Sequence, residues 1–148
     1  MVSVLPSGIR VDSFFLADSA QVVGEKLYVL GGGWNYLNLR DPAHQVELFA
    51  LVGRVLVPMQ DGEFEVPLEI HLEHPQHPEI MLGGPRFRLV LRSKVLPTQR
   101  GSVETATPFV IEVFGLSFPA PGEYAFVITH QEEEVARTRF EVRFIRAD

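Results

Sequence analysis

The side chains best suited to chemistry gather in one short stretch of the chain. They are His71, Glu73, His74, His77 and Glu79. Imidazole and carboxylate groups are the ligands that zinc and several other divalent metal ions prefer. One hypothesis is therefore a metal-binding or small-molecule-binding protein, with the loop 71–79 as its site and His71, His74 and His77 as metal ligands.

The residues around these histidines favour a simpler interpretation. Pro75 and Pro78 interrupt any helix, so the three-residue spacing does not bring the imidazoles to one helical face. In a strand, His71 would share the outer face with Glu73, and His74 would point away.

The same stretch also predicts an exposed charged face. If segments 65–73 and 86–95 are neighbouring strands, acidic residues on the first oppose arginines on the second. Such cross-strand pairs contribute about 0.2–1 kcal/mol each. The residues concerned are Glu69, His71 and Glu73 on one segment and Arg86, Arg88 and Arg92 on the other.

No other part of the chain carries a reactive motif. Gly31–Gly33 is not followed by the Lys-Ser/Thr pair and the helix of a phosphate-binding loop. The glycines indicate instead a bulge in a strand, or a backbone segment that passes beneath a bulky aromatic ring. Asp18 has no second acid at a useful spacing, so we expect a turn or backbone-bonding role. Ser117 lacks the glycine pattern of a nucleophile elbow. We therefore predict no catalytic residue, no cofactor and no enzyme activity.

Period-two alternation runs through almost the whole chain, and period 3.6 does not. It predicts an all-β fold, an antiparallel β-sandwich of about eight strands. The expected strands lie near 11–18, 26–33, 46–57, 65–73, 86–95, 107–115, 122–130 and 134–145. Two segments, Leu48–Val52 and Phe109–Phe114, are apolar on both faces, which suits central or covered strands.

The connections between these strands divide into short turns and long loops. Turns are expected at 23–26, 60–63 and 131–134, and long loops at 35–45, 74–85 and 97–107. Gly122-Glu123-Tyr124 at the entry to the penultimate strand resembles the tyrosine corner of immunoglobulin-like sandwiches. We therefore expect an immunoglobulin-like fold, with a Tyr124 hydroxyl bonded to nearby backbone. An ordinary core tyrosine is the alternative.

Composition limits the remaining possibilities. The 148 residues fit a single domain, 1–148, and 46% hydrophobic residues with 11 Phe supply material for a core between two sheets. A net charge of −6 makes nucleic acid and anionic membranes poor partners. The chain has no Cys, no signal-like N-terminus and no long apolar run, so we expect a cytoplasmic protein without membrane contact.

The first long loop carries the candidate interaction residues. Trp34 and Tyr36 flank it together with Leu37 and Leu39. If exposed, they would form a contact cluster for another protein or for a second copy of this chain. If buried, they would close one end of the sandwich.

Four short blocks resemble an uncharacterised family of small bacterial proteins, a domain of unknown function. The blocks are Leu16–Ala20, Gly24–Leu27, Leu30–Trp34 and Pro121–Tyr124. The resemblance implies a β-sandwich and brings no substrate, cofactor or catalytic residue with it. Our leading hypothesis is a non-catalytic protein-interaction or structural module that self-associates as a homo-oligomer.

Overall fold

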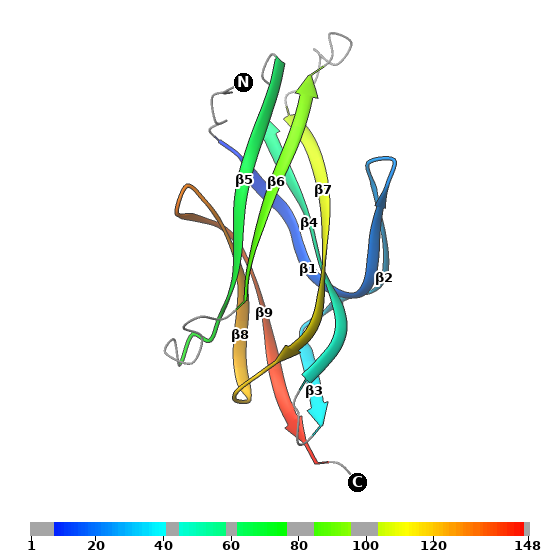
Figure 1. The fold of residues 1–148 in the computed structure, drawn as a ribbon, viewed down its shortest axis with the longest axis vertical. Coiled ribbons are helices and arrows are strands. Elements are labelled where there is room, and N and C mark those ends of the chain that lie inside the picture. The colour runs from blue at the N-terminus through cyan, green and yellow to red at the C-terminus, as the bar shows by residue number, and fades with distance from the viewer. Residues whose placement is uncertain (1–7, 41–44, 59–61, 77–84, 96–103, 147–148) are drawn as a thin grey trace.

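A computed structural model describes residues 8–40, 45–58, 62–76, 85–95 and 104–146. These residues form nine strands in two sheets and contain no helix, hence none that could cross a membrane. The four-stranded sheet has the order β2-β1-β4-β7, and the five-stranded sheet has the order β3-β9-β8-β5-β6 (Figure 1). The strands are β1 (Arg10–Val23), β2 (Lys26–Trp34), β3 (Tyr36–Arg40), β4 (Gln45–Pro58), β5 (Gly62–Glu73), β6 (Arg86–Val95), β7 (Glu104–Ser117), β8 (Gly122–His130) and β9 (Glu133–Ile145).

The all-β sandwich predicted from the sequence is confirmed, with two differences in detail. There are nine strands rather than about eight, because β3 occupies a segment that was expected to be loop. β3 also pairs parallel with β9, with Leu37 beside Val142, whereas every other pairing among the described strands is antiparallel. Leu37 and Leu39 both pack against the main core, and this inward face explains why so short a segment is a strand.

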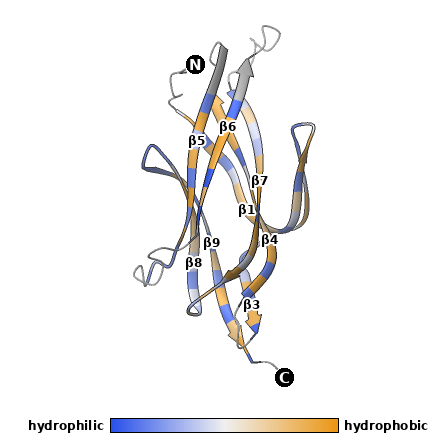
Figure 2. Ribbon diagram, viewed as in Figure 1, coloured by the Kyte–Doolittle hydropathy of each residue, from blue (hydrophilic) through white to orange (hydrophobic). Residues whose placement is uncertain are grey.

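Aromatic side chains fill the space between the two sheets, as the phenylalanine content predicted. Phe49 of β4 meets Phe126 of β8 across the interface, with ring centroids 6.0 Å apart. Phe126 in turn stacks on Phe140 of β9 at 5.5 Å. Hydrophobic and hydrophilic residues alternate along the strands, so each sheet turns one face to this core (Figure 2).

The β1–β2 hairpin folds back over the outer face of the four-stranded sheet (Figure 1). A second small core lies beneath it, in which Ala17, Ala50 and Val52 are buried. The bend coincides with a bulge at the glycine run, where the register shifts between Leu16 and Ala17. The backbone at this bulge has φ of +60° at Gly31 and +86° at Gly33. The predicted glycine bulge is therefore confirmed.

The predicted hydrogen bond of Tyr124 is also present. The buried Tyr124 hydroxyl donates to the Ala120 carbonyl oxygen at 2.6 Å, just before β8 begins. Phe118 packs edge-on against the Tyr124 ring with centroids 5.0 Å apart. This contact fixes the chain where it enters the last hairpin. The immunoglobulin-like assignment of the whole fold stays a prediction.

Candidate functional site

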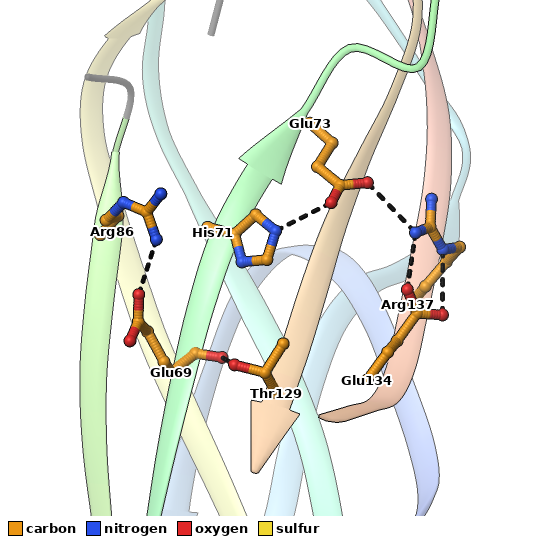
Figure 3. Close-up of polar contacts among 7 residues, drawn as sticks. All are labelled: Glu69, His71, Glu73, Arg86, Thr129, Glu134 and Arg137. Carbon is orange, nitrogen blue, oxygen red and sulfur yellow. Dashed lines mark hydrogen bonds and ion pairs between the residues drawn. The ribbon is translucent and has the colours of Figure 1, made fainter. Parts of the chain in front are cut away.

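A chain of charged side chains crosses the outer face of the five-stranded sheet (Figure 3). His71 Nε2 lies 2.9 Å from a Glu73 carboxylate oxygen, and the other Glu73 oxygen accepts a 3.1 Å bond from Arg137. Arg137 also binds Glu134 through two nitrogens, at 2.6 and 3.2 Å. These contacts connect β5 to β9 across the strand between them.

The hydrogen-bonded side chains of His71, Glu73, Arg137 and Glu134 reach across β8. Val127 lies between His71 and Arg137 in the strand register, and its side chain is almost completely buried. The aliphatic stem of an arginine can cover apolar surface while its head stays in water. The Arg137 guanidinium, through its hydrogen bonds, holds the pKa of Glu134 below its ordinary value of 4.5. We read this arrangement as structural support for the sheet.

The opposed charges predicted for β5 and β6 are present. Glu69 pairs with Arg86 at 2.7 Å, and Glu65 pairs with Arg92 at 3.1 Å. Glu73 differs from expectation, because its cationic partner is Arg137 rather than a β6 arginine. Both β5–β6 pairs are largely exposed, and pairs of this kind contribute about 0–1 kcal/mol.

The histidines proposed as metal ligands are not brought together by the described structure. His71 lies on the outer face against Glu73, whereas His74 is buried with its ring 4.5 Å from the Tyr124 ring. His77 and Glu79 lie outside the described residues. Among the residues that are described, no three His, Cys, Asp or Glu side chains gather in a metal-binding group.

The two residues proposed for protein contact lie on different sheets. Trp34, at the end of β2, packs against the core with its ring 6.0 Å from Phe49. Tyr36, on β3, is half exposed, and the Arg143 guanidinium lies 4.7 Å from its ring centroid. Trp34 therefore closes part of the core, and Tyr36 alone keeps the exposure that a contact residue needs.

Tyr36 borders a shallow hollow of about 450 Å³ on the five-stranded side. Its charged lining balances, with Arg139 and Arg143 against Glu123 and Glu141. Because these charges cancel, the hollow gives no preference for a particular ligand charge.

The four-stranded sheet is different in character, because it carries several large apolar side chains that are exposed. Leu30 on β2 is 72% exposed, and Phe114 on β7 is 69% exposed. Phe114 is opposite the exposed Leu48 of β4 in the register. We call Tyr28, Leu30, Leu48 and Phe114 the Leu30–Phe114 surface.

A hollow of about 500 Å³ adjoins Tyr28 and Leu30 of this surface. Tyr28 and Leu30 of the hairpin line one side, and Glu112 of β7 lines the other. Glu112 precedes Phe114 by two residues, and both face outward from the strand. The surface therefore combines large exposed apolar groups with one nearby carboxylate.

Asp18 and Ser117, the other residues considered for catalysis, both lie within strands. Asp18 lies within β1 rather than at a turn, and its carboxylate packs over Gly31, where a methyl group would overlap it. Ser117 ends β7 and is exposed. The exposure of Leu30 and Phe114 could not be predicted from the sequence, because an apolar residue in a strand gives no sign of whether another layer covers it.

Comparison with known proteins gives a family and structural resemblances. A family model described as "Family of unknown function (DUF6941)" matches residues 12–143. No curated protein matches the chain. One solved structure, Pseudomonas fluorescens alkylpurine DNA glycosylase AlkC bound to DNA containing an abasic site analog, is similar with a TM-score of 0.48 and 10% identity. The match covers 91% of this chain and 30% of that protein's chain.

Proposed function

The chain belongs to the family of unknown function DUF6941, and we propose that it is a non-catalytic protein-interaction module that self-associates through its four-stranded side. The observation that carries the proposal is the exposure of Leu30 and of Phe114, which lies two residues from the Glu112 that shares a hollow with Leu30. Exposed apolar groups gathered on one surface of a small domain mark contact sites more often than scattered ones do.

The contrast between the two outer faces supports this choice. The five-stranded face carries ion pairs that include Glu73–Arg137 and Glu69–Arg86, and the first of these spans its central strand, β8. The four-stranded side instead carries Glu112 and the apolar side chains of the Leu30–Phe114 surface, which are 44–72% exposed. Interface cores are depleted of charge and enriched in aromatic residues, so the four-stranded face is the better candidate.

The absence of a reactive group in the described geometry supports a non-catalytic role. Within the described parts of the chain, the base–carboxylate pair that resembles a catalytic arrangement is His71–Glu73. Its further neighbour is the Arg137 guanidinium, which binds two carboxylates and offers no nucleophile. General acid–base chemistry needs a reacting group within reach of the base, so we assign this pair a structural role.

The test is the oligomeric state in solution. We expect the wild-type chain to sediment as a dimer or larger species, and the double variant Leu30→Lys/Phe114→Lys to sediment as a monomer with an unchanged circular dichroism spectrum. The control is Val90→Lys, at an exposed position on β6, which should not change the mass. A monomeric wild-type chain at all accessible concentrations contradicts the proposal.

A further inference from the structure

Strand β7 has the sequence of a central strand and the position of an edge strand. Its segment Phe109–Phe114 is apolar on both faces apart from Glu112, as expected for a strand with neighbours on both sides. Among the strands that the structure describes, β7 pairs with β4 only and ends the four-stranded sheet. One side of this strand therefore presents backbone groups without a neighbouring strand.

β7 contains Pro108, Glu112 and a positive φ at Gly115, but it lacks the arginine row, the shortness and the glycine run that protect the other three sheet edges. β6 carries Arg86, Arg88 and Arg92, β3 is five residues long, and β2 contains the glycine bulge. Charges, shortness and bulges are the devices by which sheet edges avoid further pairing. β7 extends over 14 residues and contains no Lys or Arg.

We propose that β7 pairs antiparallel with β7 of a second copy of this chain, so that the two four-stranded sheets become one continuous sheet. This inference rests on the self-association proposed above and names the element that performs it. Adding a strand to an open edge is a common mode of recognition, in which the backbone supplies the hydrogen bonds and side chains supply the specificity.

A second copy is the occupant that the strand itself favours. A two-fold axis places a strand antiparallel to itself, so each residue must be compatible with its symmetry-related neighbours. An axis beside Glu112 would set two carboxylates opposite each other, which is unfavourable. An axis beside Ile111 instead sets Val113 opposite Phe109, and Phe114 opposite Pro108, so this register buries Phe114 against an apolar partner.

The length of the strand is sufficient for this register. Pairing about Ile111 runs from Thr107 to Gly115, where a φ of +60° marks an irregularity in the strand. At about 3.4 Å per residue this segment spans about 30 Å. Leu48, which is exposed and lies opposite Phe114 in the β4–β7 register, adds to the apolar area beside this segment. A stable interface buries roughly 800 Å² per partner.

The chain has no cysteine, which allows a direct cross-linking test. Residues directly opposite in an antiparallel pair have Cα atoms about 4.5–5.5 Å apart, within the range of a disulfide. We expect Ile111→Cys to form a disulfide-linked dimer under mild oxidation, in the otherwise unmodified chain. The control Val90→Cys, on the protected β6 edge, should stay monomeric on a non-reducing gel.

A spin label provides a second measurement that does not disturb the core. Glu112 is exposed, and in the proposed register its two copies are diagonal neighbours about 7–8 Å apart. A nitroxide on Glu112→Cys should show strong dipolar broadening that is lost on dilution with unlabelled protein. Broadening with cross-linking supports the pairing.

The outcomes separate this inference from the proposed function. A dimer by sedimentation that shows neither the Ile111→Cys cross-link nor the Glu112→Cys broadening overturns β7 pairing and leaves self-association intact. Efficient cross-linking of Val90→Cys instead would assign the contact to β6 and overturn the inference. A monomer overturns both proposals.

Discussion

The hydroxyl of Tyr124 and the carbonyl oxygen of Ala120 are joined by a 2.6 Å hydrogen bond at the entry to β8. Tyr124→Phe removes the hydroxyl and leaves the ring among its neighbours. We expect a loss of about 1 kcal/mol in the free energy of unfolding, because the Ala120 carbonyl loses its partner. Urea denaturation followed by the fluorescence of the single tryptophan, Trp34, measures it. Tyr36→Phe, at a half-exposed ring, is the control and should leave stability unchanged.

Tyr124 should also make the stability of the protein depend on alkaline pH. Burial raises the pKa of Tyr124 above its ordinary value of 10.0. A pKa raised in the folded state contributes stability that is present below pH 10 and is lost as the pH rises through the folded pKa. The stability difference between wild type and Tyr124→Phe should therefore shrink above pH 10. A difference that grows with alkalinity would contradict the assignment.

Gly53 leaves room for the ring of Phe109 in the core. A methyl group at this position would overlap the Phe109 ring, which lies 6.3 Å from the Phe14 ring. Gly53→Ala should cost about 1–3 kcal/mol through overpacking, read from the thermal midpoint. The double variant Gly53→Ala/Phe109→Leu should cost less than the sum of its two single changes, since the smaller side chain relieves the overlap. Simple additivity would exclude this explanation.

The β8–β9 turn offers a route to higher stability. Gln131 and Glu132 have φ of 52° and 68°, in the left-handed region that non-glycine residues adopt at a cost. A two-residue turn of this type prefers Asn-Gly. Replacing Gln131-Glu132 with Asn-Gly should raise the free energy of unfolding by about 1 kcal/mol. Glu25→Gly, in the β1–β2 turn where Gly24 already stands, should give a smaller gain. A lower melting temperature for the double change would refute the argument.

We expect the ion pairs of Arg137 to contribute to the free energy of unfolding by an amount that depends on salt and pH. Arg137→Met keeps an apolar stem over Val127 and removes the bonds to Glu73 and Glu134. We expect a loss of no more than about 1 kcal/mol at neutral pH, decreasing at high salt. Because the Arg137 hydrogen bonds lower the pKa of Glu134 below 4.5, this contribution is present above pH 4.5 and disappears as the pH falls through the lower folded value.

The control for Arg137 is a pair on the same face with greater exposure. Arg92→Met breaks the ion pair with Glu65, in which both side chains are more than half exposed. This change should have no measurable effect on stability in chemical denaturation at pH 7. An effect of Arg92→Met as large as that of Arg137→Met would show that burial does not distinguish the two pairs.

The sequence predicted the strands well because alternation records which residues face the core. It did not reveal β3, since Tyr36–Arg40 provides only two inward residues, Leu37 and Leu39, and its partner β9 is distant in sequence. The fold-back of the β1–β2 hairpin was also missed. Gly31–Gly33 indicated a bulge, but no local pattern specifies the surface onto which a bent hairpin packs.

The candidate surface was only partly predictable for a related reason. The segment Phe109–Phe114 was expected to be central or covered, and it lies at an edge with Phe114 exposed. A single sequence records that a residue is apolar, and it does not record strand order. Trp34 is the converse case, since the aromatic residue proposed for contact packs on Phe49.

The parallel pairing of β3 with β9 has a kinetic consequence. Tyr36 meets Glu141, and the Glu141 amide donates a 2.8 Å bond to the Asn35 carbonyl oxygen, so these contacts join residues more than a hundred positions apart. Closing such a loop is slow, because chain entropy is lost before the contacts form. On a translating ribosome, β3 must wait until β9 has emerged before this edge of the molecule can be completed.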